Sequence, residues 1–339
     1  MRTYYNVKVL QKNLIEEEGK VTVPDFYRER EGVIDYINYP DEAVLNVVNS
    51  NNNSIETIKG KSFFGGYLYA HYGHFILESL SRLSNYNGEE NIIWVGNTKY
   101  RKKFQDLIFK HLGLENVNHI FVQETIECEE LTVTDRNYII WSKFTKNHYS
   151  YLSRNSEENS KYSNKKVWLS RSGFNSYANE NIIEILLSFR GWEIIQLEEL
   201  SFQEQISVFN SAKQIAGVEG TAFHNMVFSK NVIDEIHIFK RKGKEINGNY
   251  FLISDVVNKN HKFHSPEKKP SGEVNICEVF ECLGDKLNDN DINVINYISR
   301  VKKDSKKGLV NKVKQIELQT KDRYKNLSKD LRGIIKKYE

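Results

Sequence analysis

The sequence predicts an α/β protein built around parallel β-sheets and followed by a basic amphipathic helix. Short apolar runs that end in glycine or polar residues alternate with longer segments whose apolar residues recur every three or four positions. Such alternation of strands and helices is typical of parallel sheets with helices packed on their faces. In the last forty residues, apolar side chains form one stripe within a strongly basic segment.

The clearest unit in the first part of the chain is a strand, a helix and a second strand. Residues 92–95 are a short apolar run, residues 99–112 have helical spacing, and residues 119–122 are the next apolar run. A βαβ unit implies parallel strands. We therefore expect an amino-terminal α/β domain at residues 1–152.

The middle of the chain predicts a second α/β unit of Rossmann type at residues 167–270. The polar stretch 153–166 lacks periodicity and predicts a linker or long loop. Ser201 and Glu204 have the spacing of a helix capping box. The expected strands are 167–170, 192–197, 214–218 and 235–239, and the expected helices are 179–190, 201–212, 220–228 and 251–257.

The carboxy-terminal segment 271–339 is expected to be a helical, basic extension. Residues 300–339 contain fourteen Lys or Arg and five Asp or Glu, a net charge of +9. Such a helix could contact an anionic membrane surface peripherally, or pack on the protein body or form a dimer. Packing is slightly favoured because the apolar stripe lacks Trp and Phe. The stripe consists of Leu309, Val313, Ile316, Tyr324, Leu327, Leu331 and Ile334.

Composition favours a cytoplasmic protein, located at the inner face of the cell membrane if the tail binds lipid. The amino terminus lacks the apolar run of a signal peptide, and no run of eighteen apolar residues is present. Three cysteines without a CxxC pair fit a reducing compartment. Nucleic acid is not an expected partner, because the basic residues are not interleaved with stacking aromatics.

The stretch YAHYGHFILESLSRL carries the first candidate site. On one helix, His74, Glu78 and Arg82 would lie on broadly the same side, because they are four residues apart. A carboxylate near a histidine can act as a general base, and an arginine can neutralise a phosphate. Two alternatives stay open: a surface ladder of ion pairs, and a metal site formed by His71, His74 and Glu78.

The stretch GVEGTAFHN, residues 217–225, carries the second candidate site. An expected strand ends in a glycine turn and a helix begins, so exposed N–H groups would suit a pyrophosphate. The spacing matches neither a GxGxxG fingerprint nor a Walker A loop. Glu219 would repel a phosphate, so it is expected to bind sugar or ribose hydroxyls. An ordinary strand-to-helix turn remains the alternative reading.

Two further motifs could bind a phosphate or a metal ion. Arg171 follows an expected strand at its carboxyl end, the edge where open α/β sheets bind ligands, and could hold a phosphate. A surface arginine is the alternative. Asp289 and Asp291 match a DxD pattern, but they stand near expected helix ends, where such residues cap helices. Helix capping is therefore the favoured reading, and no metal ligand is assigned.

Taken in order, these stretches resemble glycosyltransferase family 61. The matching pieces are GHFILESLSRL and the segment from VWLSRSGFNSYANEN through SFQEQ to GVEGTAFHNMVFS. The resemblance implies a GT-B-like fold with two Rossmann-type domains facing a cleft. It also implies a nucleotide-sugar donor, with UDP as the expected carrier, inversion at the anomeric carbon and no required metal or other cofactor. Bacterial members act in capsular polysaccharide or lipopolysaccharide synthesis, on oligosaccharide or lipid-linked glycan acceptors.

The resemblance also implies site residues. Glu78 is the expected base, with His74 as the alternative. Two departures stand out: many members have a second arginine where Asn175-Ser176 stand, and plant members have histidine in place of Glu219. The open alternatives in function are a pyruvyl-type transferase and a non-catalytic sugar-binding scaffold. The expected donor-binding residues are Arg82, Arg171, Gly217, Glu219, Gly220, Thr221, His224 and Asn225.

Overall fold

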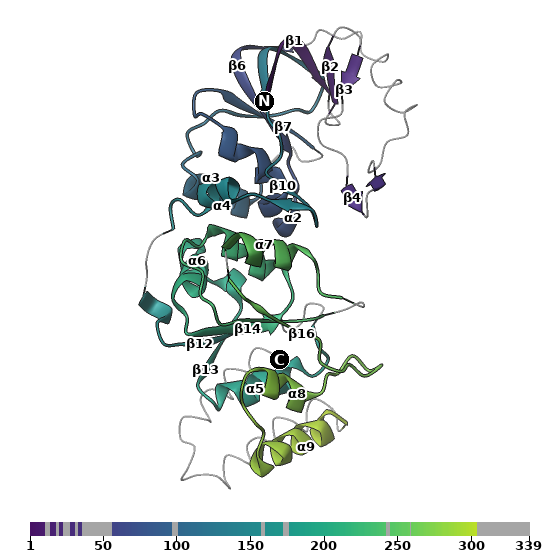
Figure 1. Ribbon diagram of the computed structural model, residues 1–339, viewed down its shortest axis with the longest axis vertical. Coiled ribbons are helices and arrows are strands. Elements are labelled where there is room, and N and C mark those ends of the chain that lie inside the picture. The colour runs from purple at the N-terminus through teal and green to yellow at the C-terminus, as the bar shows by residue number, and fades with distance from the viewer. Residues whose placement is uncertain are drawn as a thin grey trace.

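The protein has two halves stacked along its long axis, each built on one main β-sheet (Figure 1). Parallel strands with intervening helices in both halves confirm the expected α/β class. The computed structural model describes residues 1–10, 14–17, 20–22, 28–30, 33–35, 56–96, 101–156, 160–171, 176–241, 245–257 and 259–303.

The sheet of the first half is mixed. Its strand order is β3-β2-β1-β9-β6-β7-β8. The part β9-β6-β7-β8 is parallel, whereas β1 runs antiparallel to both β9 and β2. The expected βαβ unit is confirmed as β7, α3 and β8. The strands are β1 (Arg2–Leu10), β2 (Leu14–Glu17), β3 (Lys20–Thr22), β6 (Glu56–Tyr67), β7 (Asn91–Val95), β8 (His119–Phe121) and β9 (Ile126–Val133).

Short elements complete the first half. Two small hairpins pair β4 with β5 and β10 with β11. Their strands are β4 (Arg28–Arg30), β5 (Val33–Asp35), β10 (Tyr138–Ile139) and β11 (Lys143–Phe144). The helices are α2 (Tyr72–Leu77), the 3₁₀ helix η1 (Ser79–Asn85), α3 (Lys103–His111), α4 (Lys146–Leu152) and the 3₁₀ turn η2 (Ser160–Tyr162).

The sheet of the second half is wholly parallel, in the order β13-β12-β14-β15-β16. The expected order of strands and helices is confirmed, and Ser201 with Glu204 forms the expected capping box. The strands are β12 (Lys166–Leu169), β13 (Trp192–Ile195), β14 (Gln214–Val218), β15 (Ile236–Phe239) and β16 (Lys262–His264). The helices are α5 (Glu180–Ser188), η3 (Leu197–Glu199), α6 (Phe202–Ser211), η4 (Thr221–Phe228), α7 (Asn249–Val257), α8 (Ile276–Cys282) and α9 (Asp289–Lys303).

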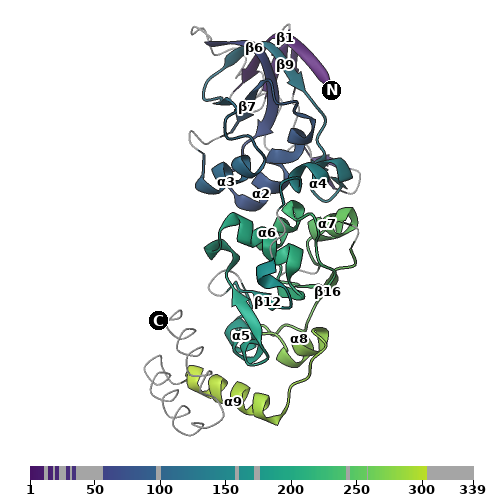
Figure 2. The same cartoon turned by 90° about the vertical axis from the view of Figure 1, so that its left-hand side faces the viewer.

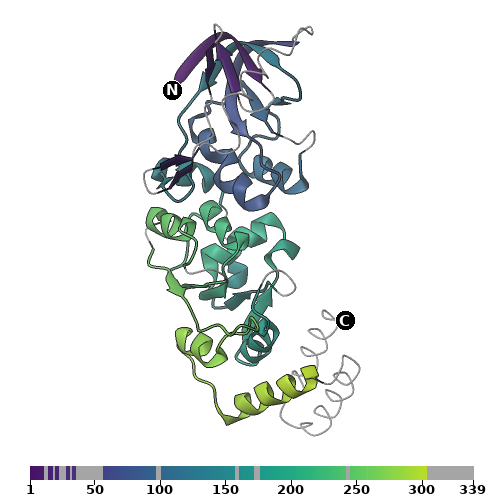
Figure 3. The same ribbon diagram turned by 90° about the vertical axis from the view of Figure 1, so that its right-hand side faces the viewer.

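Helices cover both faces of the parallel sheet because its strands are apolar on both faces. Val167 and Leu169 belong to a cluster with α6, η4 and α7, whereas Trp168 belongs to a cluster with α5 and α8. The two helix groups lie on opposite sides of the sheet, α6 and α7 toward the first half and α5, α8 and α9 away from it (Figures 1, 2 and 3). The continuous apolar strands of this half are typical of such a three-layer arrangement.

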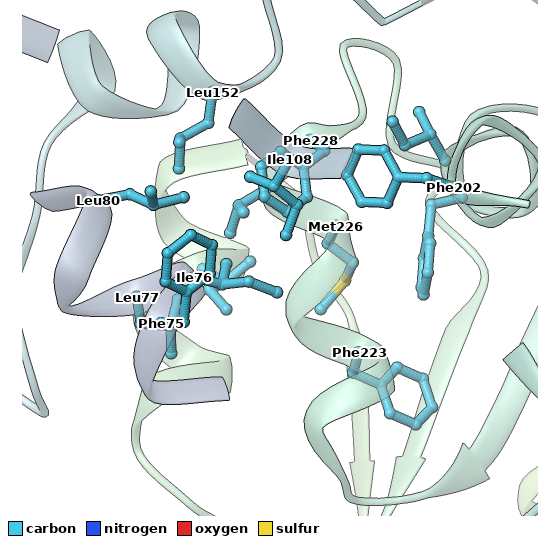
Figure 4. Packing of buried hydrophobic residues seen from close by; sticks show 14 of the residues in the cluster. Phe75, Ile76, Leu77, Leu80, Ile108, Leu152, Phe202, Phe223, Met226 and Phe228 are labelled. Atoms are coloured by element: carbon cyan, nitrogen blue, oxygen red, sulfur yellow. The ribbon is translucent and has the colours of Figure 1, made fainter. Parts of the chain in front are cut away.

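A single apolar cluster joins the two halves. Phe75, Ile76 and Leu80 of the first half belong to the same buried cluster as Met226 and Phe228 of the second (Figure 4). The halves are therefore fixed to each other through shared core packing in this region. The expected arrangement of two domains facing a cleft stays a prediction.

The carboxy-terminal extension begins as two helices packed on the second half. Val294, Ile295 and Ile298 of α9 pack against the cluster formed by α5 and α8. The expected amphipathic stripe from Leu309 onward, with its proposed membrane or dimer contacts, lies outside the described residues. Within the described part of the chain, none of the helices combines the length and the apolar character needed to cross a membrane.

The helix expected to carry His74, Glu78 and Arg82 is interrupted. α2 ends at Leu77, and a 3₁₀ helix starts at Ser79. The hydroxyl of Ser79 donates to the carbonyl of Tyr67 at 2.7 Å and accepts from the N–H of Tyr69 at 2.9 Å. Local bonds of this kind compete with regular helix geometry. The expected i, i+4, i+8 alignment is therefore wrong beyond Glu78.

Candidate functional site

The halves make a close contact where α2 lies against η4. A Cβ atom added to Gly73 would lie 2.7 Å from Cγ2 of Thr221 and 3.1 Å from Nδ1 of His224. A larger residue would force the two helices apart, because Cβ atoms essentially never approach within 3.0 Å. α2 lies at the end of the first half that faces the second half in both perpendicular views (Figures 1 and 2). The contact places the histidine-rich segment of the first half on the turn that follows β14.

A chain of side-chain hydrogen bonds crosses this contact. The hydroxyl of Tyr72 donates to Oδ1 of Asn225 at 2.6 Å, and Nδ2 of Asn225 donates to Oε1 of Gln205 at 2.7 Å. Asn225 is 1% exposed, so the loss of either partner would leave a buried amide unsatisfied. The amide of Asn225 connects α6, η4 and α2, and its expected contact with the donor stays a prediction.

We expect Tyr72→Phe to lower the free energy of unfolding by about 1–3 kcal/mol, because it leaves the buried Oδ1 of Asn225 without its donor. Urea denaturation measures the change. Tyr5→Phe is the matched control, because Tyr5 is 64% exposed and should change stability little. Equal stability of the Tyr72 and Tyr5 variants would contradict the structural role of this hydrogen bond.

His74 and Glu78 form an imidazole–carboxylate pair at the end of α2. Nδ1 of His74 contacts Oε1 of Glu78. The side chain of Glu78 is 11% exposed and that of His74 is 37% exposed. The imidazole ring of His74 also lies against the rings of Tyr69 and His71, with centroids 5.3 and 5.2 Å away. The pair is oriented and partly shielded from water, as a general base and its orienting partner would be.

His224 lies beside this pair, on the second half. Its side chain is buried, and neither ring nitrogen has a hydrogen-bond partner among the described residues. Burial, and then the nearby His74 and His71, lower the pKa of His224 to about 3. At neutral pH the imidazole is therefore uncharged and can offer one donor and one acceptor to a ligand.

Arg171 lies against the glycine turn of the second half. It follows β12, and a Cβ atom added to Gly220 would overlap its guanidinium group. Burial, then the neighbouring Arg241, lowers the pKa of Arg171. Gly220 is extended, with φ −176°, so its role is to leave space and not to adopt a left-handed backbone. The expected proximity of Arg171 to the turn is thus observed.

The segment after Gly220 is a 3₁₀ helix, where an α-helix was expected. The N–H of Phe223 donates to the carbonyl of Gly220 at 3.0 Å, so the N–H groups of Thr221 and Ala222 precede the first bond of the helix. Asn225 is held from two sides by α2 and α6, so tertiary contacts set the local geometry here. Two helix-start N–H groups lie next to the position of the Arg171 guanidinium.

Glu180 supports the backbone of Arg171. Its Oε1 accepts from Nε1 of Trp168 at 3.1 Å and from the N–H of Arg171 at 3.2 Å. Burial and then the neighbouring Glu184 raise the pKa of Glu180 to about 7. The sequence indicated Glu180 only as part of a helix start. The pattern that marked it was the Asn-Glu pair before an apolar helix.

We expect Glu180→Gln to reduce the pH dependence of stability. The pKa of Glu180 is about 7 in the folded protein against the ordinary 4.5, so the folded state binds the proton more tightly. Wild-type stability should therefore fall as pH rises from 4.5 to 7, by about 3 kcal/mol at most from this group. The difference between denaturation curves of the wild type and the variant isolates this group from the buried histidines. Parallel curves, like those expected for the exposed control Glu115→Gln, would contradict this assignment.

Two expected donor-binding residues have other roles. Glu219 is 7% exposed, and its carboxylate accepts from the N–H of Arg241 at 3.0 Å and of Asn247 at 3.2 Å. It therefore fixes the connection from β15 to α7, and its binding of sugar hydroxyls stays a prediction. A Cβ atom at Gly217 would lie 2.9 Å from the carbonyl oxygen of Leu169, so this glycine serves close strand packing.

Arg82 does not join the donor site. Its side chain is 3% exposed and its guanidinium carbon lies 5.8 Å from the centre of the Phe64 ring in β6. Because the α-helix ends before Ser79, Arg82 does not continue the face of His74 and Glu78. The reading of His74, Glu78 and Arg82 as a surface ladder is also wrong, because Arg82 is buried.

Asn288 and Asp291, the second acidic residue of the DxD pattern, cap α9. Oδ1 of Asn288 accepts from the N–H of Asn290 at 2.9 Å and of Asp291 at 3.1 Å, and Oδ2 of Asp291 accepts from the N–H of Asn288 at 2.7 Å. Asp291 also pairs with Arg190. The capping interpretation is confirmed. Within the described ranges, no three His, Cys, Asp or Glu side chains form a group that could hold a metal ion.

Two tyrosines that the sequence did not single out connect the pair to the turn. The hydroxyl of Tyr138 is buried, and the charge of Glu78 and then Tyr250 add to burial in raising its pKa. Burial also raises the pKa of Tyr250, and a hydrogen bond with the backbone of Gly220 opposes that rise. Aromatic residues in apolar segments resemble ordinary residues of the hydrophobic core. Their spacing in the sequence therefore did not indicate a role in the site.

The arrangement combines a carboxylate–imidazole pair on one half with an arginine beside a helix start on the other, groups that suit transfer to a hydroxyl. Asn175, where many relatives have arginine, lies outside the described residues. No curated protein matches the chain at a significant level. Residues 72–233 match the family model described as Glycosyltransferase 61. This segment includes the His74–Glu78 pair, Arg171 and the turn after β14, and the match supports membership of glycosyltransferase family 61.

Proposed function

We propose that the protein is an inverting glycosyltransferase that moves a sugar from a nucleotide sugar, with UDP as the expected carrier, to an oligosaccharide or lipid-linked glycan. The family supports glycosyl transfer in general. The contact between α2 and η4 carries the finer proposal, because it sets the His74–Glu78 pair beside a turn with cationic and N–H groups.

In the proposed reaction, Glu78 accepts the proton of an acceptor hydroxyl. The oxygen then forms a bond to the anomeric carbon from the face opposite the nucleotide, and the bond from that carbon to the diphosphate oxygen breaks. Inversion follows from this single displacement. His74 holds the carboxylate in place through Nδ1 and is the alternative base.

The leaving diphosphate gains negative charge as its bond to the sugar breaks. Arg171 and the N–H groups of Thr221 and Ala222 are placed to stabilise that charge. Fixed donors in a partly buried site act more strongly than the same groups in water. We propose that these groups replace a metal. A chelator should then leave the rate unchanged, and a loss restored by Mg²⁺ or Mn²⁺ would contradict this point.

The proposed setting is the assembly of capsular polysaccharide or lipopolysaccharide in the cytoplasm, at the inner face of the membrane if the tail binds lipid. Its support is the resemblance of the ordered motifs to bacterial members of the family. Cys128, Cys277 and Cys282 are free thiols, which fits a reducing compartment. Flotation of the whole chain with anionic vesicles, compared with a chain ending at residue 303, tests the membrane contact.

A panel of nucleotide sugars tests the proposal. We expect at least one to raise the midpoint of thermal unfolding and to donate its sugar to a glycan acceptor with inverted anomeric configuration. Transfer of a pyruvyl group from phosphoenolpyruvate would favour the pyruvyl-type transferase instead. Binding of glycans with neither transfer nor donor hydrolysis across the panel would favour a scaffold.

A further inference from the structure

Three neighbouring parallel strands of the second half end at one edge of the sheet. β12 pairs with β14 at Leu169 and Gly217, and β14 pairs with β15 at Val218 and Phe239. Extending these registers brings Arg171 level with Glu219, and Arg241 level with Gly220. The turn after β14 therefore has an arginine on each side, both at the carboxyl edge where open α/β sheets bind ligands.

Contacts hold both arginines at this turn. The guanidinium group of Arg171 occupies the space that a side chain at Gly220 would need. The backbone N–H of Arg241 donates to the carboxylate of Glu219 at 3.0 Å. Nε of Arg241 is buried and has no hydrogen-bond partner in the described ranges. A buried, unsatisfied donor of a charged group is costly unless a ligand completes it.

Two arginines and the carboxylates of Glu219, Glu180 and Glu198 lie at or near the turn. Glu219 directs its two oxygens to backbone N–H groups of the β15–α7 connection. The charges of Glu180 and Glu198 raise the pKa of Arg171. Both arginines act to lower the pKa of Tyr250. The two guanidinium groups are close enough that Arg241 lowers the pKa of Arg171. Two like charges held together are the complement of a ligand with two negative charges.

We propose that Arg241 binds the donor diphosphate together with Arg171, with one guanidinium group on each side of the Glu219–Gly220 turn. The inference rests on the proposed function. It adds a residue that binds the donor, located just after β15. It also compensates for the second arginine that Asn175-Ser176 lack, because the segment after β15 supplies an arginine. The signal available in the sequence was the position of Arg241 two residues after an expected strand, as for Arg171.

Binding selectivity between nucleotides tests the role of Arg241. We expect Arg241→Met to weaken binding of the best nucleoside diphosphate about 10- to 100-fold, as the loss of a charge-assisted hydrogen bond does. Binding of the matching monophosphate should change less, so the preference for diphosphate over monophosphate should shrink. Arg241→Lys keeps the charge without the planar fork and should be intermediate. Isothermal titration calorimetry of the full chain gives both constants.

Lys213→Met is the matched control, because Lys213 precedes β14 at the opposite edge of the same sheet. It should bind both nucleotides like the wild type. Unchanged diphosphate binding by Arg241→Met, with weakened binding by Arg171→Met, would overturn the inference and leave the proposed function standing. Equal weakening of diphosphate and monophosphate binding would also overturn it. A wild type that binds no nucleoside diphosphate of any base would overturn the proposed function and the inference with it.

Discussion

Glu78→Gln is expected to reduce the turnover number by a factor of about 10²–10⁴, the usual contribution of a general base. The amide keeps the size of the side chain and an oxygen that can contact His74, but it cannot take the proton of the acceptor hydroxyl. Thermal unfolding and nucleotide binding should stay near wild-type values, because the proposed donor contacts lie on the second half. Initial rates at saturating donor measure the effect.

Glu115→Gln, an exposed substitution in the same half, is the control for charge loss. His74→Gln separates the two candidate bases: a smaller loss than that of Glu78→Gln is expected if His74 only orients the carboxylate. A Glu78→Gln variant with a near-normal rate, or a larger loss for His74→Gln, would show that the base is assigned to the wrong residue.

Gly220→Ala is expected to lower kcat/KM for the donor about 10- to 100-fold without harming the fold. The new methyl group would overlap the guanidinium of Arg171, which is the end of a flexible side chain and can move away. The extended backbone at residue 220 accepts alanine without strain. The loss then equals that of the phosphate contact, about 1.5–3 kcal/mol. Steady-state kinetics with varied donor measures it.

Arg171→Met should produce the same loss, and the double variant should be no worse than either single one, because both remove the same interaction. Gly248→Ala is the control, since its Cβ would meet the Trp141 ring only at an ordinary 3.4 Å. Multiplying losses in the double variant would mean that Gly220 and Arg171 act independently, contrary to their contact in the structure.

The second half was the easier part to predict. Its strands are apolar on both faces and its helices carry readable start signals, such as the hydroxyl of Ser201 accepting from the N–H of Glu204. Observed strands β12, β14 and β15 begin and end within one residue of the expected ranges. Local sequence and tertiary packing agree here, and that agreement is what makes a segment readable.

The first half was harder because its strands do not alternate cleanly. In β1, Tyr5 is exposed and Asn6 has φ of 50°, so the local pattern is broken within the strand. The long strand β6 contains Gly60, Gly65 and Gly66, which weaken any strand signal. Pairing with β9, distant in sequence, stabilises both strands, and no local pattern reports it.

Site residues could be predicted where charged or titratable side chains stand among apolar residues. They could not be predicted where their residue type is common in that kind of segment. His74, Glu78 and Arg171 stand out from apolar surroundings; the helix that begins before His74 contacts η4, and Arg171 lies at Gly220 just before η4. The predicted alignment of Arg82 with His74 and Glu78 was wrong because the side chain of Ser79 changed the helix type. Arg241 was not singled out because it stands in a basic run, KRKGK, that resembles an ordinary solvated loop.

A crystal structure of the full chain with its preferred nucleoside diphosphate is the most direct test of the central claim, that a base on the first half acts on a donor held by the second. The expected result has the diphosphate within hydrogen-bond distance of the Arg171 guanidinium and its terminal phosphate directed toward Glu78. A diphosphate bound away from the turn after β14, or a Glu78 side chain on the far side of α2 from that phosphate, would contradict the claim.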